Sequence, residues 1–227
     1  MEFPIIPLES LAYGYRQGIF PMSDIPGLMD EDSRQIGRIE WYRPHDRALF
    51  PIEGMRVSKS LAKFMRAEPY EIRFDTEFEA VIRKCRRPYD NWIDETIVQT
   101  YLAAYKAGWG HCAECWEDGN LIGGVYGVAV GAVFCAESMF HRKTNGSKIA
   151  LYHLIERCRL QGFTTFDVQI MNPHLESLGA YEMTQDEYLA LIKTEMLKTT
   201  LWGLSISGSN HIHAKMPSKN PGPVRNW

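Results

Sequence analysis

Hydrophobic residues recur with the period of a helix in several segments of the chain. The apolar side chains of residues 7–18 share one face, and Gly18 marks the end of that helix. Ser147 is the expected N-cap of a later helix, and Thr184 with Glu187 has the spacing of a capping box. The predicted helices cover residues 7–18, 58–65, 77–85, 95–108, 147–161 and 184–198.

Other segments have the composition of strands. Residues 111–116 and 121–130 flank a Glu-Asp-Gly-Asn sequence typical of a hairpin turn, and residues 132–139 predict a third strand. Residues 164–170 are β-branched and aromatic, which predicts a fourth strand. Residues 23–40 are polar and acidic without sustained periodicity, so we expect a loop there.

The order of these elements indicates the mixed α/β (α+β) fold class in one layered main domain. We expect an N-terminal arm over residues 1–50 and the main domain over residues 51–200. Residues 201–227 are rich in Gly, Ser, Pro and Asn, which predicts a flexible tail.

Composition narrows the class of protein. With 45% hydrophobic and 23% charged residues, the chain is an ordinary globular protein. Its formal net charge of -3 excludes a surface that is basic all over, so contact with nucleic acid requires a local patch. The N-terminus lacks the basic region of a secretory signal, and the longest uncharged stretch is too short for a membrane span. We expect no membrane association and a cytoplasmic location.

The cysteines give no metal signature. Their odd number, five, fits a reducing compartment. Cys112 and Cys115 form a C-x-x-C sequence, but no second pair follows, and strand geometry points the two side chains apart. The seven histidines are scattered. We therefore expect neither a metal nor a cofactor.

Three polar residues lie in the predicted strands and are candidates for chemistry. Asp167 and Gln169 leave the same face of a strand, close in sequence to Asn172, and such a pair could hold and orient an amine. The same alternation also fits a solvent-facing polar stripe. Glu137 ends an apolar strand, where a lone carboxylate either binds an amine or is capped by backbone donors.

Basic residues are concentrated in and beside two predicted helices, followed by an aromatic residue, Trp92. Lysine and arginine bind phosphates and an aromatic ring can stack on a terminal base, so this region is a candidate for the acceptor end of a tRNA. A solvated helix face gives the same pattern, and nearby acidic residues dilute the charge. The candidate residues are Arg56, Lys59, Lys63, Arg66, Arg83, Lys84, Arg86 and Arg87.

Several segments, in order and with matching spacing, resemble the leucyl/phenylalanyl-tRNA protein transferase family. The resemblance extends from about residue 11 to residue 191. It rests on residues 13–21 (YGYRQGIFP), 41–44 (WYRP), 47–51 (RALFP), 123–129 (GGVYGVA), 134–140 (FCAESMF), 145–148 (NGSK), 167–169 (DVQ) and 177–180 (SLGA).

The resemblance implies an acetyltransferase-like (GNAT-like) main domain that moves leucine or phenylalanine from a charged tRNA to a protein beginning with Arg or Lys. Tagging of that protein for degradation is also implied. The family's acidic and amide site residues fall on Glu137, Asp167 and Gln169, which we expect to be catalytic. The substrate-binding residues implied are Trp92, Val125, Tyr126, Phe134, Ser138 and Asn172.

The chain also departs from the family pattern. The family's usual N-terminal domain is reduced to an arm, and Met22 stands where a tryptophan is common. Val125 replaces a frequent methionine, and Cys158 replaces an aromatic residue. These changes predict a reshaped amino-acid pocket, so the donor could be leucine, phenylalanine or methionine.

Two other functions remain open at this stage. An acyl-coenzyme A N-acyltransferase would use the turn at residues 141–147, which runs into a helix N-terminus and could hold an anion. Only Gly146 of the glycines expected there is present, which disfavours that enzyme. The third alternative is a non-catalytic module that binds protein N-termini or tRNA ends.

Overall fold

A mixed sheet forms the centre of this computed structural model, which describes residues 3–24, 34–67, 69–88, 92–202 and 211–212. In spatial order, the described strands of this sheet are β10 (His211–Ile212), β4 (Glu71–Phe74), β5 (Gly110–Glu117), β6 (Asn120–Val130), β7 (Val133–His141), β8 (Thr165–Gln169), β3 (Asp46–Phe50) and β9 (Tyr181–Thr184). Neighbouring strands are antiparallel except β7 and β8, which are parallel. A separate two-stranded sheet pairs β1 (Phe20–Asp24) with β2 (Arg38–Tyr42).

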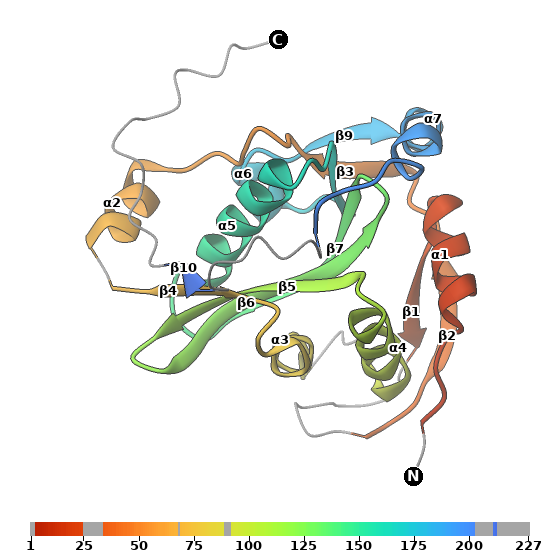
Figure 1. Ribbon diagram of the computed structural model, residues 1–227, viewed down its shortest axis with the longest axis horizontal. Coiled ribbons are helices and arrows are strands. Elements are labelled where there is room, and N and C mark those ends of the chain that lie inside the picture. The colour runs from red at the N-terminus through yellow and green to blue at the C-terminus, as the bar shows by residue number, and fades with distance from the viewer. Residues whose placement is uncertain (1–2, 25–33, 68, 89–91, 203–210, 213–227) are drawn as a thin grey trace.

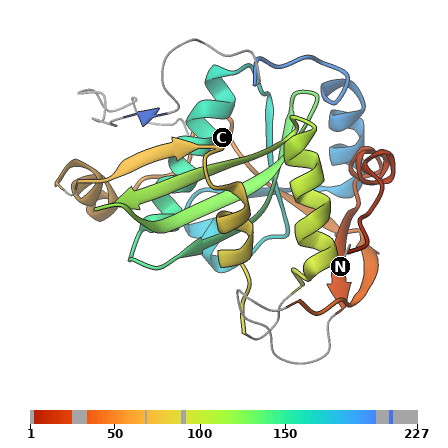
Figure 2. The ribbon, with the colours of Figure 1, turned by 60° about the horizontal axis from the view of Figure 1, so that its bottom comes forward.

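Helices cover both faces of the main sheet (Figures 1 and 2). The first core cluster lies on one face and includes buried residues of α1 (Leu8–Arg16), α3 (Phe78–Lys84), α4 (Glu95–Lys106) and α7 (Gln185–Glu195). The second core cluster lies on the other face and includes residues of α2 (Lys59–Ala67), α5 (Gly146–Leu160) and α6 (Pro173–Ser177). The result is a three-layer arrangement of the mixed α/β class, as the sequence predicts.

Most of the predicted elements are present with shifts of a few residues at their ends. The hairpin and third strand correspond to β5, β6 and β7, and the capping box of Thr184 and Glu187 opens α7. Cys112 belongs to the first core cluster and Cys115 to the second, which confirms that their side chains leave opposite faces of β5.

The prediction of a loop over residues 23–40 is wrong at both ends, because Ser23 and Asp24 end β1 and residues 38–40 begin β2. Strand β2 is half-buried to exposed along its length, so it lacks the apolar alternation by which strands are recognised. The short strands β3, β4 and β9 and the helix α6 were likewise not predicted. Strand β3 lies in the main sheet, although the expected domain boundary at residue 50 placed it in the N-terminal arm.

The prediction that Ser147 is the N-cap of helix α5 is also wrong. Helix α5 begins at Gly146, and its N-cap is Asn145, which has a left-handed backbone and makes no side-chain capping bond. The start of the helix is instead fixed by close packing, because a Cβ on Gly146 would lie 2.4 Å from the carbonyl oxygen of Ile122. A helix start that depends on contact with a distant strand carries no local capping signal.

Two further observations concern membrane spans and the predicted C-terminal tail. No described helix is long and apolar enough to cross a membrane. Most of the predicted tail, residues 203–210 and 213–227, falls outside the described residues, and His211–Ile212 pairs with β4.

Candidate active site

A cavity of about 310 Å³ lies where strands β7 and β8 separate. Their parallel pairing ends at Cys135 and Asp167. The residues that follow on each strand line the cavity: Ala136, Glu137 and Ser138 from β7, and Val168 and Gln169 from β8. The cavity therefore forms where two neighbouring strands no longer share hydrogen bonds.

Both strands have a bulge at this point. On β7, Ser138 pairs with Tyr126 and Ala136 with Gly127, so Glu137 is the extra residue. On β8, Gln169 pairs with Ala48 and Asp167 with Leu49, and Gln169 has a positive φ of 66°. Bulges redirect side chains and are common beside functional sites. Here they turn Glu137 and Gln169 toward each other.

Glu137 has one carboxylate oxygen that is fully engaged and one that is not. Its Oε1 accepts hydrogen bonds from the Tyr15 hydroxyl at 2.6 Å and from Gln169 Nε2 at 2.9 Å. Its buried Oε2 accepts no hydrogen bond from any described residue. Burial raises the pKa of Glu137 to about 7, although the bonds from Tyr15 and Gln169 favour the charged form. Near neutral pH this carboxyl can therefore both take up and release a proton.

Asp167 lies behind the cavity wall and is fully buried. Arg47 binds both of its oxygens, with Nε to Oδ1 at 2.9 Å and Nη2 to Oδ2 at 2.6 Å. The Tyr188 hydroxyl donates to Oδ2, and the backbone N–H of Gln169 donates to Oδ1. Burial lowers the pKa of Arg47, but the Asp167 carboxylate outweighs this effect and raises it. The Arg47–Asp167 pair thus fixes the backbone that carries Gln169.

The rest of the cavity wall is apolar where it is buried and mixed at its half-buried to exposed rim. Val125, Leu151 and Leu175 contribute apolar surface, and Met22 and Trp92 contribute larger side chains. Arg87 is the basic residue on this wall and is exposed. A cavity with apolar walls and a few polar groups is typical of a ligand- or substrate-binding site.

The predicted substrate-binding residues fall into two groups. Trp92, Val125, Ser138 and Asn172 line the cavity. Tyr126 does not; it is fully buried and packs against Tyr101 and Phe78 in the first core cluster. Phe134 is also fully buried, and its ring stacks on those of Phe166 and Trp202.

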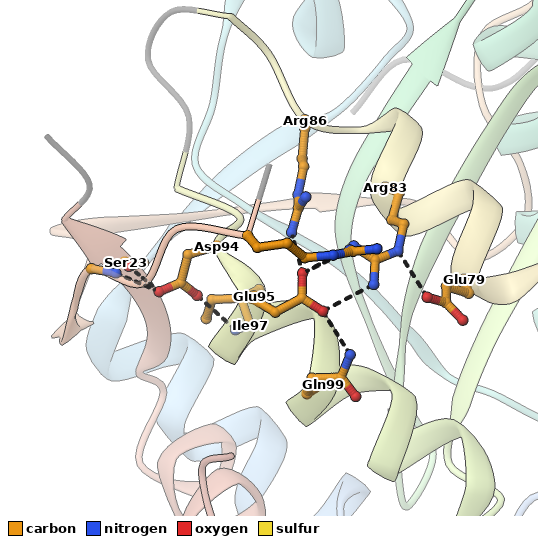
Figure 3. Close-up of polar contacts among 10 residues, drawn as sticks. Ser23, Glu79, Arg83, Arg86, Asp94, Glu95, Ile97 and Gln99 are labelled. Atoms are coloured by element: carbon orange, nitrogen blue, oxygen red, sulfur yellow. Dashed lines mark hydrogen bonds and ion pairs between the residues drawn. The ribbon is translucent and has the colours of Figure 1, made fainter. Parts of the chain in front are cut away.

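The predicted basic patch is divided by the sheet. Helices α2 and α3 pack on opposite faces, so their basic residues do not form one surface (Figure 1). Arg56, Lys59, Lys63 and Arg66, in or beside α2, are exposed. Arg83 and Arg86 turn inward and bind Glu95 (Figure 3). Lys84 is half-buried.

Sequence reasoning missed the residues that support Glu137 and Asp167. The hydroxyls of Tyr15 and Tyr101 form a hydrogen bond of 2.7 Å beside Glu137, yet in sequence both residues belong to apolar helix faces. Arg47 offers a weak signal, because it is a charge that immediately precedes the apolar run Ala48-Leu49-Phe50. A buried charge of this kind requires a partner, which the sequence did not identify.

Comparison with known proteins shows the family of this chain. A sequence profile described as leucyl/phenylalanyl-tRNA protein transferase matches residues 49–193, a range that contains Glu137, Asp167 and Gln169. The chain belongs to this family. A leucyl/phenylalanyl-tRNA--protein transferase of Chlorobium luteolum is 42% identical over 86% of this chain and 98% of its own length.

Two more relatives with the same name extend the comparison within the family. The protein of Gloeobacter violaceus is 42% identical over 82% of this chain and 91% of its own length. The protein of Ruegeria pomeroyi is 43% identical over 81% of this chain and 83% of its own length. The profile match starts in β3, so Tyr15 and Met22 lie outside it although they contact the site.

Proposed function

We propose that this chain is an aminoacyltransferase that moves leucine, phenylalanine or methionine from a charged tRNA to the N-terminal amine of a protein beginning with Arg or Lys. Family membership supports the aminoacyl transfer. The observation that carries the rest is the cavity between β7 and β8, in which Glu137 and Gln169 meet above an apolar floor.

The donor ester is already activated, so the enzyme has mainly to bring the two reactants together. The acceptor amine attacks the ester carbonyl, the new amide bond forms, and the bond to the ribose oxygen breaks. The amine gives up a proton and the departing ribose oxygen takes one. Glu137, with its unpartnered Oε2 and its pKa of about 7, is suited to accept the proton or to hold the cationic acceptor.

Gln169 and Asp167 are assigned linked roles in this proposal. The side chain of Gln169 reaches the cavity and orients the amine beside Glu137. Asp167 acts through Gln169, because its Oδ1 accepts the Gln169 backbone N–H and both of its oxygens are also engaged by Arg47. Ser138 and Asn172, on the same wall, are available to contact the polar groups of the substrates.

Donor selection is assigned to the apolar part of the cavity. Val125 and Leu151 present aliphatic surface to an incoming side chain, and Trp92 lies at the rim, where a terminal adenine could stack. Burial discriminates between apolar side chains by about 1–3 kcal/mol per methylene. A large apolar side chain such as that of leucine, phenylalanine or methionine would therefore be preferred over a small or polar one.

The acetyltransferase-like description of the main domain is also a proposal. The antiparallel run β4–β7, followed by α5 and the parallel strand β8, supports it, as does a substrate cavity between β7 and β8. Exposed basic residues of α2 and the segment before it, Arg56, Lys59, Lys63 and Arg66, are proposed to contact tRNA. A cytoplasmic location follows from the proposed use of charged tRNA as substrate.

The test is transfer of radiolabelled leucine from purified leucyl-tRNA to a peptide that begins with Arg, beside the same peptide beginning with Glu. We expect labelling of the Arg peptide only, and its loss in Glu137→Gln. Glu114→Gln is the matched control, because Glu114 is also fully buried and hydrogen-bonded but does not line the cavity. Absence of labelling with leucyl-, phenylalanyl- and methionyl-tRNA would contradict the proposal.

Retention of labelled acetyl-coenzyme A by the folded protein would instead favour an acyl-coenzyme A enzyme. Binding of leucyl-tRNA without transfer would favour a non-catalytic module. The same preparation can be used for both measurements, so the three functions are separated directly.

A further inference from the structure

A buried glutamate, Glu95, binds the side chains of three arginines, Arg34, Arg83 and Arg86. Figure 3 shows its contacts with Arg83 and Arg86. Its side chain is 1% exposed. The hydrogen bonds run from Arg83 Nη2 to Oε1 at 2.9 Å, Arg83 Nη1 to Oε2 at 3.0 Å, Arg86 Nη2 to Oε2 at 3.1 Å, Arg34 Nη1 to Oε2 at 3.1 Å and Gln99 Nε2 to Oε1 at 2.7 Å. Each carboxylate oxygen of Glu95 thus accepts at least two hydrogen bonds.

The preceding residue, Asp94, holds a second set of partners and is also fully buried. Its Oδ1 caps α4 by accepting the N–H of Ile97 at 2.8 Å. Its Oδ2 accepts the Ser23 hydroxyl at 2.8 Å and the Gly37 N–H at 2.7 Å. The two carboxylates together connect the end of α3, the start of α4, strand β1 and the segment before β2.

Three residues that line the cavity adjoin these anchored positions. Arg87 follows Arg86, Met22 precedes Ser23, and Trp92 lies two residues before Asp94. The backbone N–H of Ser23 also donates to the carbonyl oxygen of Trp92 at 3.1 Å. The placement of this part of the wall therefore depends on the Asp94–Glu95 pair.

The charge of this rim suits the nucleic-acid substrate. Arg87 is exposed and positive, and Trp92 offers a ring on which a terminal base can stack. The other polar wall carries Glu137, which attracts a cationic acceptor. An anionic tRNA end is drawn to the first and repelled by the second.

We propose that Glu95 is a positioning residue for the aminoacyl-tRNA: it holds Arg83, Arg86 and Arg34 so that Arg87 and Trp92 are placed to receive the acceptor end. This inference rests on the proposed function. It assigns Arg83 and Arg86 to the support of the rim, because their side chains are only 15% and 0% exposed and both bind Glu95.

The experiment measures steady-state kinetics of Glu95→Gln with leucyl-tRNA and an Arg peptide as the two varied substrates. We expect KM for leucyl-tRNA to rise about tenfold, equivalent to the loss of about one charge-assisted hydrogen bond. We expect kcat and the KM for the peptide to stay within about twofold, because the β7–β8 wall does not depend on Glu95. Glu95→Asp keeps the charge and should restore most of the tRNA affinity.

Glu114→Gln is the matched control for loss of a buried carboxylate. Glu114 accepts hydrogen bonds from the Thr76 hydroxyl, the Thr76 and Glu77 N–H groups and Trp116 Nε1, and it lies on β5 away from the cavity wall. If this variant raised KM for leucyl-tRNA as Glu95→Gln does, or if both variants lost activity in proportion to their unfolded fraction, the positioning role would be overturned.

Further outcomes distinguish a failure of the Glu95 role from a failure of the proposed function. A lower KM for leucyl-tRNA in Glu95→Gln would show that the released arginines bind tRNA themselves, and an unchanged KM would show that Glu95 has no such role. Filter binding of leucyl-tRNA to wild type and Glu95→Gln gives the same comparison without turnover. A wild type that transfers nothing, but binds leucyl-tRNA more tightly than Glu95→Gln does, would refute the proposed function and leave the positioning role intact.

Discussion

Glu137, on the cavity wall, and Glu95, at the start of α4, are both buried carboxylates, yet their surroundings are opposite. Glu137 is held by neutral donors, Tyr15 and Gln169, through one oxygen only. Glu95 is held by three arginines and Gln99 through both oxygens. Burial raises the pKa of Glu137 to about 7; for Glu95 burial acts in the same direction, but the hydrogen bonds from its partners prevail and lower the pKa to about 2.

The difference separates a carboxyl suited to catalysis, Glu137, from a carboxylate suited to a structural role, Glu95. A carboxyl that titrates near neutral pH and keeps one oxygen unpartnered can exchange a proton with a substrate. A carboxylate that is saturated by cations stays ionised and orders the side chains around it. Burial alone would not have distinguished the two residues; the charge and number of their partners do.

The largest effect is expected at Glu137 in catalysis. Glu137→Gln keeps the size of the side chain and removes its ability to accept a proton, so kcat for aminoacyl transfer should fall about 10³-fold, within the usual range for an acid–base residue. Single-turnover transfer from leucyl-tRNA measures this step. A loss of less than about tenfold would remove Glu137 from the chemistry.

The second largest effect is on stability, which the same substitution, Glu137→Gln, should increase. The usual pKa of 4.5 is raised to about 7 in the folded chain, so between these pH values the folded chain keeps a proton that the unfolded chain has released. The free energy of unfolding therefore falls as pH rises through this window. Glu137→Gln carries no such penalty and should gain up to about 3 kcal/mol relative to wild type between pH 4.5 and pH 8.

Urea unfolding of both proteins across this pH range measures the difference. Glu114→Gln serves again as the control for the loss of a buried, hydrogen-bonded carboxylate outside the cavity wall. A constant difference between Glu137→Gln and wild type at all pH values would mean that Glu137 titrates at its usual pKa.

The third effect is the acid response of Glu95. Its pKa is lowered from 4.5 to about 2, so the stability it provides is present above pH 4.5 and is lost as pH falls toward 2. Glu95→Gln lacks this loss, and the gap in unfolding free energy between the two proteins should shrink by about 1–2 kcal/mol from pH 5 to pH 2.5, after allowance for solvent screening. Acid unfolding followed by circular dichroism tests this; a gap that widens on acidification contradicts it.

The smallest effect is expected at Tyr15. Tyr15→Phe removes a donor that favours the charged form of Glu137, so the pH at which activity rises should move upward. Loss of one hydrogen bond of about 1 kcal/mol raises the pKa of Glu137 by about 0.7, so the ionised fraction and with it the activity should be about threefold lower at pH 7, with recovery at higher pH. Tyr188→Phe is the matched control, because the Tyr188 hydroxyl binds Asp167 instead of Glu137. An unshifted profile in Tyr15→Phe would count against the link.

Much of the architecture could be predicted from local pattern. The hairpin of β5 and β6, the helix α4 and the capping box at Thr184 all follow from periodicity and turn chemistry, which depend on neighbouring residues. Strands β3, β4 and β9 could not be predicted in this way. Each is only four or five residues long, and each owes its existence to partners far away in the chain.

The candidate site shows the same division. The sequence by itself determined Glu137, Asp167 and Gln169 as candidates, because polar residues in apolar strands stand out and their motifs match a family. Only the tertiary structure decided their different places, since the end of the β7–β8 pairing opens the cavity at Glu137 and Gln169 while Arg47 encloses Asp167. Arg83 in α3 and Arg86 just after it show the same division. Their charge is visible in the sequence, but whether it faces a phosphate or Glu95 depends on contacts that the fold alone creates.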